Sequence, residues 1–423
     1  PIGADTLTAD LQVLDDDGRP VAELLGLRLK RAPRGSARRP AGAVGEWLHE
    51  VAWQPVPLPA PLEAAGDPAG RLATELVRWE SRPELARYDE AMRVLDRRSV
   101  AYIVGALRTL GCDLAPGRVL RRAGLDTSLG ALPRYRRLLG RWLDILTEDG
   151  LLQATAEGWV VVGDGTSVIE APTDAPDGDE AVAGAEASLL LRCGPRLADV
   201  VRGQCDPLAL LFPDGAQDIA ERLYHESPLA RVSGAFVREA VQAILARIPA
   251  GRPIRILEVG GGTGGTTAAI LPSLPSERSK YVFSDVSAAF IARARHRFAA
   301  YPFLETRTLD LEAEPGPEEL ASARFDVVVA ANVLHATADL RRTLDQCRRR
   351  LAPGGALVLV EVTVPQRWID LTFGLTDGWW KFSDESLRPR YPLLDRSQWM
   401  TLLEDAGFSG VTVREQAAVR VRG

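Results

Sequence analysis

The sequence contains little cysteine, little histidine and no long apolar segment. Its 423 residues include four cysteines and four histidines, and the cysteines lie far apart, without the paired spacing of a zinc site. We therefore predict reduced thiols and no metal centre. No apolar run approaches the roughly 18 residues that a membrane-spanning helix needs, and no charged amino-terminal segment precedes an apolar one. These absences predict a cytoplasmic protein without a membrane anchor or a secretory signal.

Acidic side chains outnumber basic ones, and the formal net charge is −6. A negatively charged protein is repelled by phosphate backbones, so nucleic acid is not an expected partner, although the many arginines leave room for local basic patches. With 46% hydrophobic residues, a chain of this length can form two or three domains, each with its own core. The chain starts at Pro1 rather than methionine, which suggests a piece of a longer protein.

The residue pattern divides the amino-terminal half into a hairpin, a linker and a mainly helical region. Residues 1–31 alternate apolar and polar side chains around a turn. Because an isolated hairpin is marginally stable, it either completes a sheet supplied by an upstream domain or packs on this chain. Residues 32–45 have linker composition. Residues 46–249 show the apolar spacing of helices, with a helix turning through Gly150 into a wing-like hairpin. Within them, 163–187 are small and acidic and predict a mobile loop.

Strands and helices alternate from residue 250 to residue 423. The predicted strands are 254–259, 281–285, 305–309, 325–331, 356–362 and 411–422. Such alternation predicts a parallel sheet with helices on both faces. Ligands of these sheets bind beyond the carboxyl ends of the strands, where the strand order reverses.

The most informative stretch is the glycine-rich turn from Glu258 to Gly265, between an apolar strand and a helix-like segment. A strand that ends in glycines leaves backbone N–H groups free and lets a ligand approach the main chain closely, so we expect a nucleotide-type pocket here. Gly260, Gly262 and Gly265 also satisfy the pattern G-x-G-x-x-G, with Asp285 about twenty residues further on. An oxidoreductase with a nicotinamide cofactor is therefore one candidate for this turn.

Further motifs follow the turn in order: Tyr281–Asp285, Leu309–Glu312, Phe325–His335 and Pro353–Glu361. With them the chain resembles the class I S-adenosylmethionine-dependent methyltransferases. More narrowly, Asn332–Thr337 has the sequence Asn-Val-Leu-His-Ala-Thr, and in this pattern the chain is similar to the C-methyltransferase domain of modular (type I) polyketide synthases. The resemblance runs from about Leu223 to Val413, roughly half of the chain.

The resemblance implies an α/β fold with two parts. Residues 250–423 would form the class I methyltransferase core, which is Rossmann-like with a doubly wound sheet, and residues 46–249 a mainly helical lid subdomain on its amino-terminal side. Residues 1–31 would be the closing strands of a dehydratase-like domain, so neighbouring synthase domains are expected partners.

The cofactor implied by the resemblance is S-adenosyl-L-methionine. The glycine backbone would approach its amino-acid end, and Glu258 would balance its positive charges directly or through water. Asp285 is suited to two adjacent ribose hydroxyls, because a carboxylate offers two acceptors. In this family the acid at the position of Asp310 meets the adenine amino group. Tyr224 could cover the cofactor, donate to an acceptor carbonyl or be a core residue, and each acid could instead cap a helix or turn. The cofactor-binding candidates are Glu258, Gly260, Gly262, Gly264, Asp285, Asp310, Leu311, Asn332 and Tyr224.

His335 and Glu361 are the catalytic candidates, because each follows an apolar strand that we predict in the sheet. Imidazole titrates near neutrality and can take and release a proton. If the two strands are neighbours, the carboxylate can hold the ring in one tautomer and stabilise the imidazolium that forms. The structural alternative is a histidine that caps a turn and a solvated carboxylate at a strand end.

The resemblance implies a β-ketoacyl substrate on the phosphopantetheine arm of an acyl carrier protein, methylated at the α-carbon. His335 would remove the α-proton, and the enolate would attack the methyl group. O-methylation of an enol or hydroxyl on a carrier-bound intermediate remains open, as does a non-catalytic scaffold domain. Gly378–Trp380 and Trp399 could wall an acyl tunnel or pack in a core.

Overall fold

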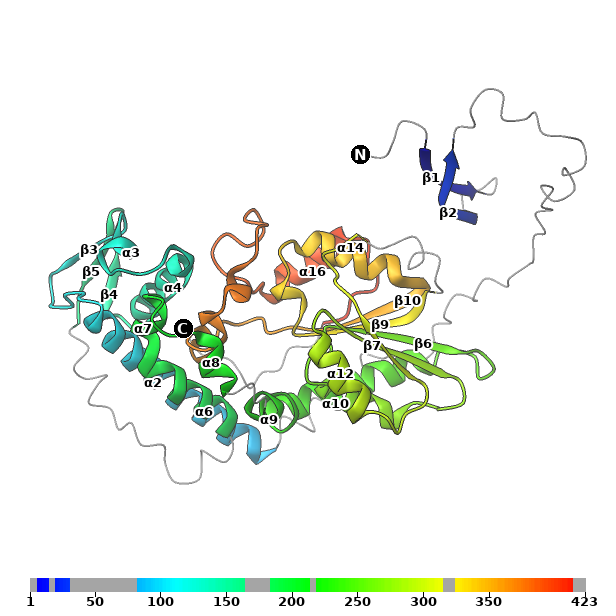
Figure 1. Cartoon of the computed structure of the whole chain (residues 1–423), viewed down its shortest axis with the longest axis horizontal. Coiled ribbons are helices and arrows are strands. Elements are labelled where there is room, and N and C mark those ends of the chain that lie inside the picture. Colours follow the sequence, from blue (N-terminus) through cyan, green and yellow to red (C-terminus); the bar gives the residue numbers. More distant parts are fainter. Residues whose placement is uncertain are drawn as a thin grey trace, which may run out of the picture.

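The computed structural model describes residues 6–14, 20–30, 82–163, 183–213, 218–314 and 324–413. Figure 1 shows a helical body at one end, a sheet with its helices at the other, and an amino-terminal hairpin that stands clear of both. The hairpin consists of β1 (Thr6–Leu14) and β2 (Pro20–Lys30), paired antiparallel from Thr6↔Lys30 to Leu14↔Pro20. The predicted hairpin is thus confirmed. Its origin in a dehydratase-like domain stays a prediction, and the predicted linker lies outside the described residues.

Removal of residues 1–31 is expected to leave the melting temperature of the remaining chain within about 2 °C of the original, because the hairpin stands clear of both packed bodies and a lone hairpin adds little stability. Differential scanning calorimetry of the full and shortened chains measures the difference. A fall of more than about 5 °C, which is on the order of 1 kcal/mol for a domain, would show that the hairpin packs on this chain.

The helical body is built on α2 (Pro83–Thr109) and α4 (Arg136–Glu148). The predicted helical spacing is confirmed in α4, where Trp142 and its apolar neighbours at positions 138, 139, 143, 145 and 146 are all buried. The other helical elements are α3 (Leu125–Ser128), η2 (Pro133–Tyr135), α6 (Gly184–Cys193), η3 (Gly194–Arg196), α7 (Leu197–Val201), α8 (Pro207–Leu211) and α9 (Asp218–His225). The loop predicted over 163–187 is wrong at its end, because α6 begins at Gly184; residues 164–182 lie outside the described part.

A small antiparallel sheet follows α4, where the wing-like hairpin was predicted. Its strands are β3 (Val119–Arg121), β4 (Leu152–Ala154) and β5 (Gly158–Val161), in the order β3-β5-β4. The chain leaves α4 through Gly150, whose φ of 71° is in the left-handed region that glycine tolerates. The hairpin is therefore confirmed, and β3 is an additional strand that pairs with it from before the helix.

The main sheet has five parallel strands in the order β10-β9-β6-β7-β8. They are β6 (Ile254–Val259), β7 (Ser279–Asp285), β8 (Leu304–Thr308), β9 (Phe325–Ala331) and β10 (Leu351–Val360). The strand order reverses between β6 and β9, so the carboxyl ends of these two strands border the place where such folds bind ligands. Of the strand predicted over 411–422, residues 411–413 are not a strand and the rest lies outside the described residues.

Both faces of the main sheet are covered by helices. Ile256 and Tyr281 face a core with α10 (Pro228–Leu245), α11 (Gly265–Ile270) and α12 (Ala288–Arg297), whereas Leu257 and Val328 face α14 (Leu340–Arg350) and α16 (Arg396–Asp405). Neighbouring residues of one strand point to opposite faces, which is why the central strand β9 is apolar at every position from Val327 to Ala331. The predicted doubly covered parallel sheet is confirmed. Helix α10 falls in the range predicted for the lid, but it packs in this sheet's core.

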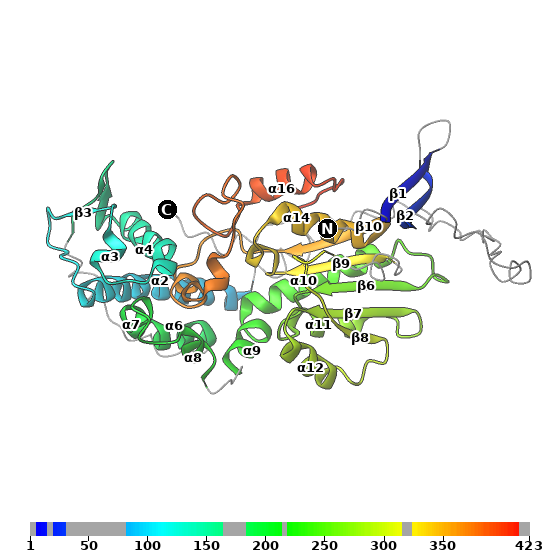
Figure 2. The ribbon, with the colours of Figure 1, turned by 45° about the horizontal axis from the view of Figure 1, so that its top comes forward.

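The segment after β10 returns to the helical body through α15 (Arg367–Asp370), η7 (Phe373–Leu375) and η8 (Asp377–Trp380). Figures 1 and 2 show this orange segment between the helical body and the sheet. Asp370 is fully buried and accepts hydrogen bonds from Arg141 Nε at 2.8 Å and from the Tyr391 hydroxyl at 2.6 Å. The segment therefore anchors on α4 while it runs past the carboxyl ends of the strands.

No helix in the described part of the chain has both the length and the apolar character needed to cross a membrane.

Candidate functional site

The glycine-rich loop after β6 passes through three left-handed residues, Gly260, Gly262 and Gly264, with φ of 61°, 52° and 82°. A Cβ atom on Gly260 would lie 2.2 Å from Val333 Cγ2, so the loop packs directly on the turn after β9. A Cβ on Gly262 would have no neighbour closer than 4.0 Å. The backbone at Gly262 is consequently open to a ligand, as the sequence predicts for this turn.

Asp285 ends β7 beside this loop and is 6% exposed. Its Oδ2 accepts from the Gly262 N–H at 2.9 Å, and its Oδ1 accepts from the Ser287 N–H at 2.8 Å. Each carboxylate oxygen keeps a second lone pair, so both can still accept from a diol. The structure thus places Asp285 against the open part of the loop, as a binding role would require.

Glu258 lies beneath the loop, and only 2% of the residue is exposed. Its Oε2 accepts hydrogen bonds from the Tyr281 hydroxyl at 2.8 Å and from the Thr267 hydroxyl. Burial raises the pKa of Glu258 to about 7, and the nearby charge of Asp285 adds to the rise. The side chain therefore fastens α11 to β7 in the present structure, and its direct contact with a cofactor stays a prediction.

Replacing Glu258 with glutamine is expected to flatten the pH dependence of stability between about pH 4.5 and pH 7. A carboxyl whose pKa is raised on folding binds more protons in the native state across this window, so its contribution to the free energy of unfolding falls as pH rises. Urea unfolding of both proteins at pH 5 and pH 8 measures the difference, expected on the order of 2 kcal/mol. Parallel pH profiles would contradict this origin.

The remaining cofactor candidates lie around the same edge of the sheet. Asp310 follows β8, is exposed and accepts from the Glu312 N–H at 2.9 Å, whereas Leu311 is 6% exposed and packs in the core beneath α14. Asn332 follows β9, is exposed and has φ of 52°, the one positive φ at a non-glycine among the described residues. Tyr224, in α9, is 43% exposed, and its carbonyl oxygen would lie 2.3 Å from a Cβ on Gly265. Asp310, Asn332 and Tyr224 are thus accessible to a ligand, and Leu311 is mostly enclosed.

The structure brings His335 and Glu361 together. His335 lies in η6 (Leu334–Ala336), and its Nδ1 is 2.5 Å from Glu361 Oε2. The other oxygen, Glu361 Oε1, accepts from the Leu334 N–H at 2.8 Å and the Val333 N–H at 3.2 Å. The carboxylate needs a donor at Nδ1, which leaves the lone pair of Nε2 as the basic position of the ring. The glutamate thereby fixes both the turn and the tautomer.

Trp379 and Tyr391 complete the surroundings of this pair and are residues whose position the sequence did not indicate. The Trp379 ring is 5.3 Å from the His335 ring at 66° and 6.3 Å from the Tyr391 ring. Trp380, in contrast, donates its Nε1–H to Gly374 O at 2.7 Å within the helical body, and Trp399 belongs to α16 and is buried between that helix and the sheet. Of the tryptophans considered for an acyl tunnel, only Trp379 lies at the site. Val286 directly follows Asp285 and is 65% exposed, which is unusual for a large apolar side chain; it was not among the residues predicted from the sequence.

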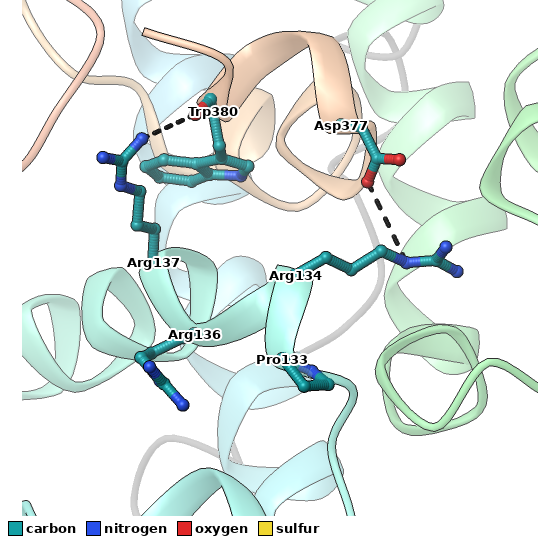
Figure 3. A pocket seen from close by; sticks show the side chains of 6 residues that line it. All are labelled: Pro133, Arg134, Arg136, Arg137, Asp377 and Trp380. Atoms are coloured by element: carbon teal, nitrogen blue, oxygen red, sulfur yellow. Dashed lines mark hydrogen bonds and ion pairs between the residues drawn. The ribbon is translucent and has the colours of Figure 1, made fainter. Parts of the chain in front are cut away.

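A hollow of about 360 Å³ lies at the junction of the helical body and η8, and Figure 3 shows its lining. Arg134 faces Asp377 at 3.9 Å across the hollow, while Arg137 Nη1 donates to Trp380 O at 2.7 Å. It contains neither glycine-loop residues nor His335. We assign Arg137 of α4 and Arg134 of η2 to holding η8 in place, which also positions Trp379 against His335. The described residues contain no cluster of metal-binding side chains.

Known proteins similar to this chain agree with the fold. The family described as "Methyltransferase domain" matches residues 257–357. The crystal structure of the CurJ carbon methyltransferase is 39% identical, superposes with a TM-score of 0.74 and covers 84% of this chain and 94% of its own. That of the DszA carbon methyltransferase is 30% identical, with a TM-score of 0.70, and covers 81% of this chain and 89% of its own.

Curated relatives place such a domain inside much larger proteins. The non-reducing polyketide synthase ausA of Aspergillus calidoustus is 34% identical over 335 residues, which are 77% of this chain and 13% of the relative. The chain therefore spans about an eighth of the length of that synthase. These similarities confirm the class I methyltransferase fold, Rossmann-like with a mainly helical amino-terminal region, and do not support the nicotinamide alternative. The chain belongs to the S-adenosylmethionine-dependent carbon methyltransferase domains of polyketide synthases.

Proposed function

We propose that this domain methylates the α-carbon of a β-ketoacyl chain carried by an acyl carrier protein, with His335 as the base and Glu361 as the residue that orients it. The observation that carries the proposal is the 2.5 Å contact between Nδ1 of His335 and Oε2 of Glu361, at the carboxyl ends of neighbouring strands. That edge of the sheet also holds the glycine loop, because Gly260 packs on Val333, two residues before the histidine.

The residues of this edge fit S-adenosyl-L-methionine, which supplies an electrophilic methyl group when bound. The loop at Gly262 is open to a ligand, and Asp285 retains acceptor capacity for the ribose hydroxyls. The exposed Asp310 provides a hydrogen-bond acceptor for the adenine ring of the cofactor, and the exposed Val286 provides an apolar surface for it. We assign Gly260, Gly262, Gly264 and Asn332 to the amino-acid end, Tyr224 to the cover of the pocket, and Glu258 and Leu311 to its support.

The pair can generate the carbon nucleophile that the reaction requires. An α-proton between two carbonyl groups is acidic enough for imidazole to remove it, and Nε2 of His335 receives that proton while the electron pair spreads over the enolate. The Glu361 carboxylate stabilises the imidazolium through the Nδ1–H bond. Once the α-carbon of the enolate has taken up the methyl group, His335 releases the proton to water. Only 8% of His335 is exposed, so bulk water competes little for the base.

We infer a carrier protein as the partner because the relatives are multidomain polyketide synthases. Their intermediates would reach this site on a phosphopantetheine arm, and neighbouring synthase domains would deliver and collect the carrier. The second candidate, O-methylation of an enol or hydroxyl, uses the same base; the names of the similar solved structures favour carbon.

The experiment is incubation of a carrier-bound β-ketoacyl substrate with S-adenosylmethionine whose methyl group carries deuterium. Intact-mass spectrometry should show one added methyl group, and fragmentation of the released acyl chain should locate the label on the α-carbon. Label on oxygen would establish the second candidate instead. No label, with cofactor binding intact, would overturn the substrate assignment.

A further inference from the structure

The carbonyl oxygen of Thr263, in the middle of the glycine loop, is held by two side chains from outside the loop. His225 Nε2 lies 3.1 Å from this oxygen, and Arg297 Nη1 donates to it at 3.2 Å. His225 is the last residue of α9, and Arg297 is the last residue of α12. The carboxyl ends of α9 and α12 therefore hold the glycine loop from outside.

The contact with Thr263 O indicates the tautomer of His225. Arg297 approaches both ring nitrogens, with Nη2 3.3 Å from Nδ1 and Nη1 3.0 Å from Nε2, so its contacts alone do not choose between them. A carbonyl oxygen can only accept, so Nε2 carries the hydrogen that Thr263 O receives, and Nδ1 is the acceptor for Arg297. Nη1 and Nε2 then both donate to the same carbonyl. Burial and the charge of Arg297 lower the pKa of His225, in agreement with a neutral ring.

The two contacts with Thr263 O order the loop, which has little stiffness of its own. Gly262 and Gly264 flank Thr263, and glycine loses more conformational entropy on ordering than any other residue. On the N–H side, Gly262 is held by Asp285 at 2.9 Å, and the Gly264 N–H reaches Gly261 O at 2.9 Å. Because the peptide unit between Thr263 and Gly264 is planar, fixing the Thr263 carbonyl also fixes the direction of the Gly264 N–H.

We propose that His225, with Arg297, is a positioning latch that holds the glycine loop in its cofactor-binding shape and couples the docking of α9 to cofactor affinity. The close approach of the Tyr224 carbonyl to Gly265, where a Cβ atom would lie at 2.3 Å, extends the same contact along the loop. The inference rests on the proposed function only in placing the amino-acid end of the cofactor at this loop.

The first test compares two replacements of His225 by calorimetric titration with S-adenosylmethionine. Leucine keeps the bulk and removes the hydrogen bonds, so the Kd should rise roughly fivefold to tenfold, while kcat at saturating cofactor stays within about twofold. Glutamine places an N–H near the position of Nε2 and an acceptor for Arg297, so it should recover most of that loss. His296→Gln, at an exposed position next to Arg297, is the matched control and should bind as the original chain does.

A pH profile separates the latch from simple packing. The groups that face His225 are Arg297 from α12 and, nearby, Glu221 of α9 and Glu226 after it. Protonation would place a second cation against Arg297 and remove the Nδ1 acceptor, so the affinity of the original chain should fall as pH drops below the ordinary histidine pKa of about 6.5. The glutamine variant should lack this fall.

Hydrogen exchange of the protein without cofactor completes the test. His225→Leu should speed exchange of the amides of residues 261–264, and His225→Gln should not. Unchanged affinity in the leucine variant, or a glutamine variant as weak as the leucine one, would overturn the latch. Should the original chain fail to bind S-adenosylmethionine, the proposed cofactor site fails, whereas the exchange result still decides whether His225 holds the loop.

Discussion

Replacing His335 with alanine is expected to slow methyl transfer by roughly 10²–10⁴-fold, the usual contribution of a general base, while cofactor affinity stays close to its original value. The rate falls because Nε2 is the basic atom of the site. Affinity is spared because the imidazole ring lies against Trp379 and Glu361 rather than against the glycine loop. Single-turnover methylation of a carrier-bound β-ketoacyl substrate measures the rate, and calorimetric titration measures cofactor binding.

Glu361→Gln is expected to lose nearly as much activity, because of what each carboxylate oxygen does. Oε1 accepts two backbone N–H groups of the turn, and Oε2 faces Nδ1 of His335. A glutamine that keeps its oxygen on the turn presents its NH₂ group to Nδ1, which then becomes the acceptor, and the proton moves to Nε2. The ring is held in the wrong tautomer for a base.

The two residues act as one unit, so the double variant should be little slower than His335→Ala alone. Additive losses would mean that Glu361 acts independently of the histidine. Full activity of His335→Ala would overturn the mechanism, and a parallel loss of cofactor affinity would reassign the histidine to binding. His296→Ala, which changes an exposed histidine of α12, is the matched control.

The sequence predicts the pairing of His335 with Glu361 because parallel neighbouring strands end at the same edge of a sheet. Both strands are apolar runs with the polar residue at the carboxyl end, a local pattern that specifies the long-range contact. The same holds for Asp285 and the glycine loop, which meet across β6 and β7. These parts of the site follow from strand periodicity and topology alone.

The burial of Glu258 follows from its position in the strand. Ile254 and Ile256 lie four and two residues before Glu258 in β6, and both face the core beneath α10 and α11. A residue two places further on must point to the same side. Strand parity alone therefore indicates that Glu258 points into the protein, where it meets Tyr281 and Thr267.

The approach of Trp379 to His335 could not be predicted in this way. The tryptophan reaches the histidine because η8 is held on α4, through the Arg137 hydrogen bond to Trp380 O and through the contacts of Asp370 with Arg141 and Tyr391. The two arginine contacts join residues more than two hundred positions apart, and no periodicity encodes them. The position of His225 against Thr263 depends on docking of the same kind.

Asp285→Ala is expected to weaken the binding of S-adenosylmethionine by about 2–4 kcal/mol, the loss of one or two charge-assisted hydrogen bonds. In the dissociation constant this is roughly a 30-fold to 1,000-fold increase. The carboxylate faces the open stretch of the loop and retains a lone pair on each oxygen, so it is placed for the two ribose hydroxyls. Calorimetric titration measures the change.

Asp285 also holds the Gly262 N–H, so a loss of affinity in Asp285→Ala could come from the loop rather than from the ribose. A cycle with S-adenosylhomocysteine and its 2′,3′-dideoxy analogue separates the two causes. If the carboxylate binds the ribose, removing the hydroxyls costs the original chain affinity but costs the alanine variant almost none. Asp285→Asn should fall between them, since its amide oxygen can still accept from one donor while the charge is gone. An equal cost of removing the hydroxyls in both proteins would assign Asp285 to the loop alone, and an unchanged dissociation constant in Asp285→Ala would move the cofactor site away from β7.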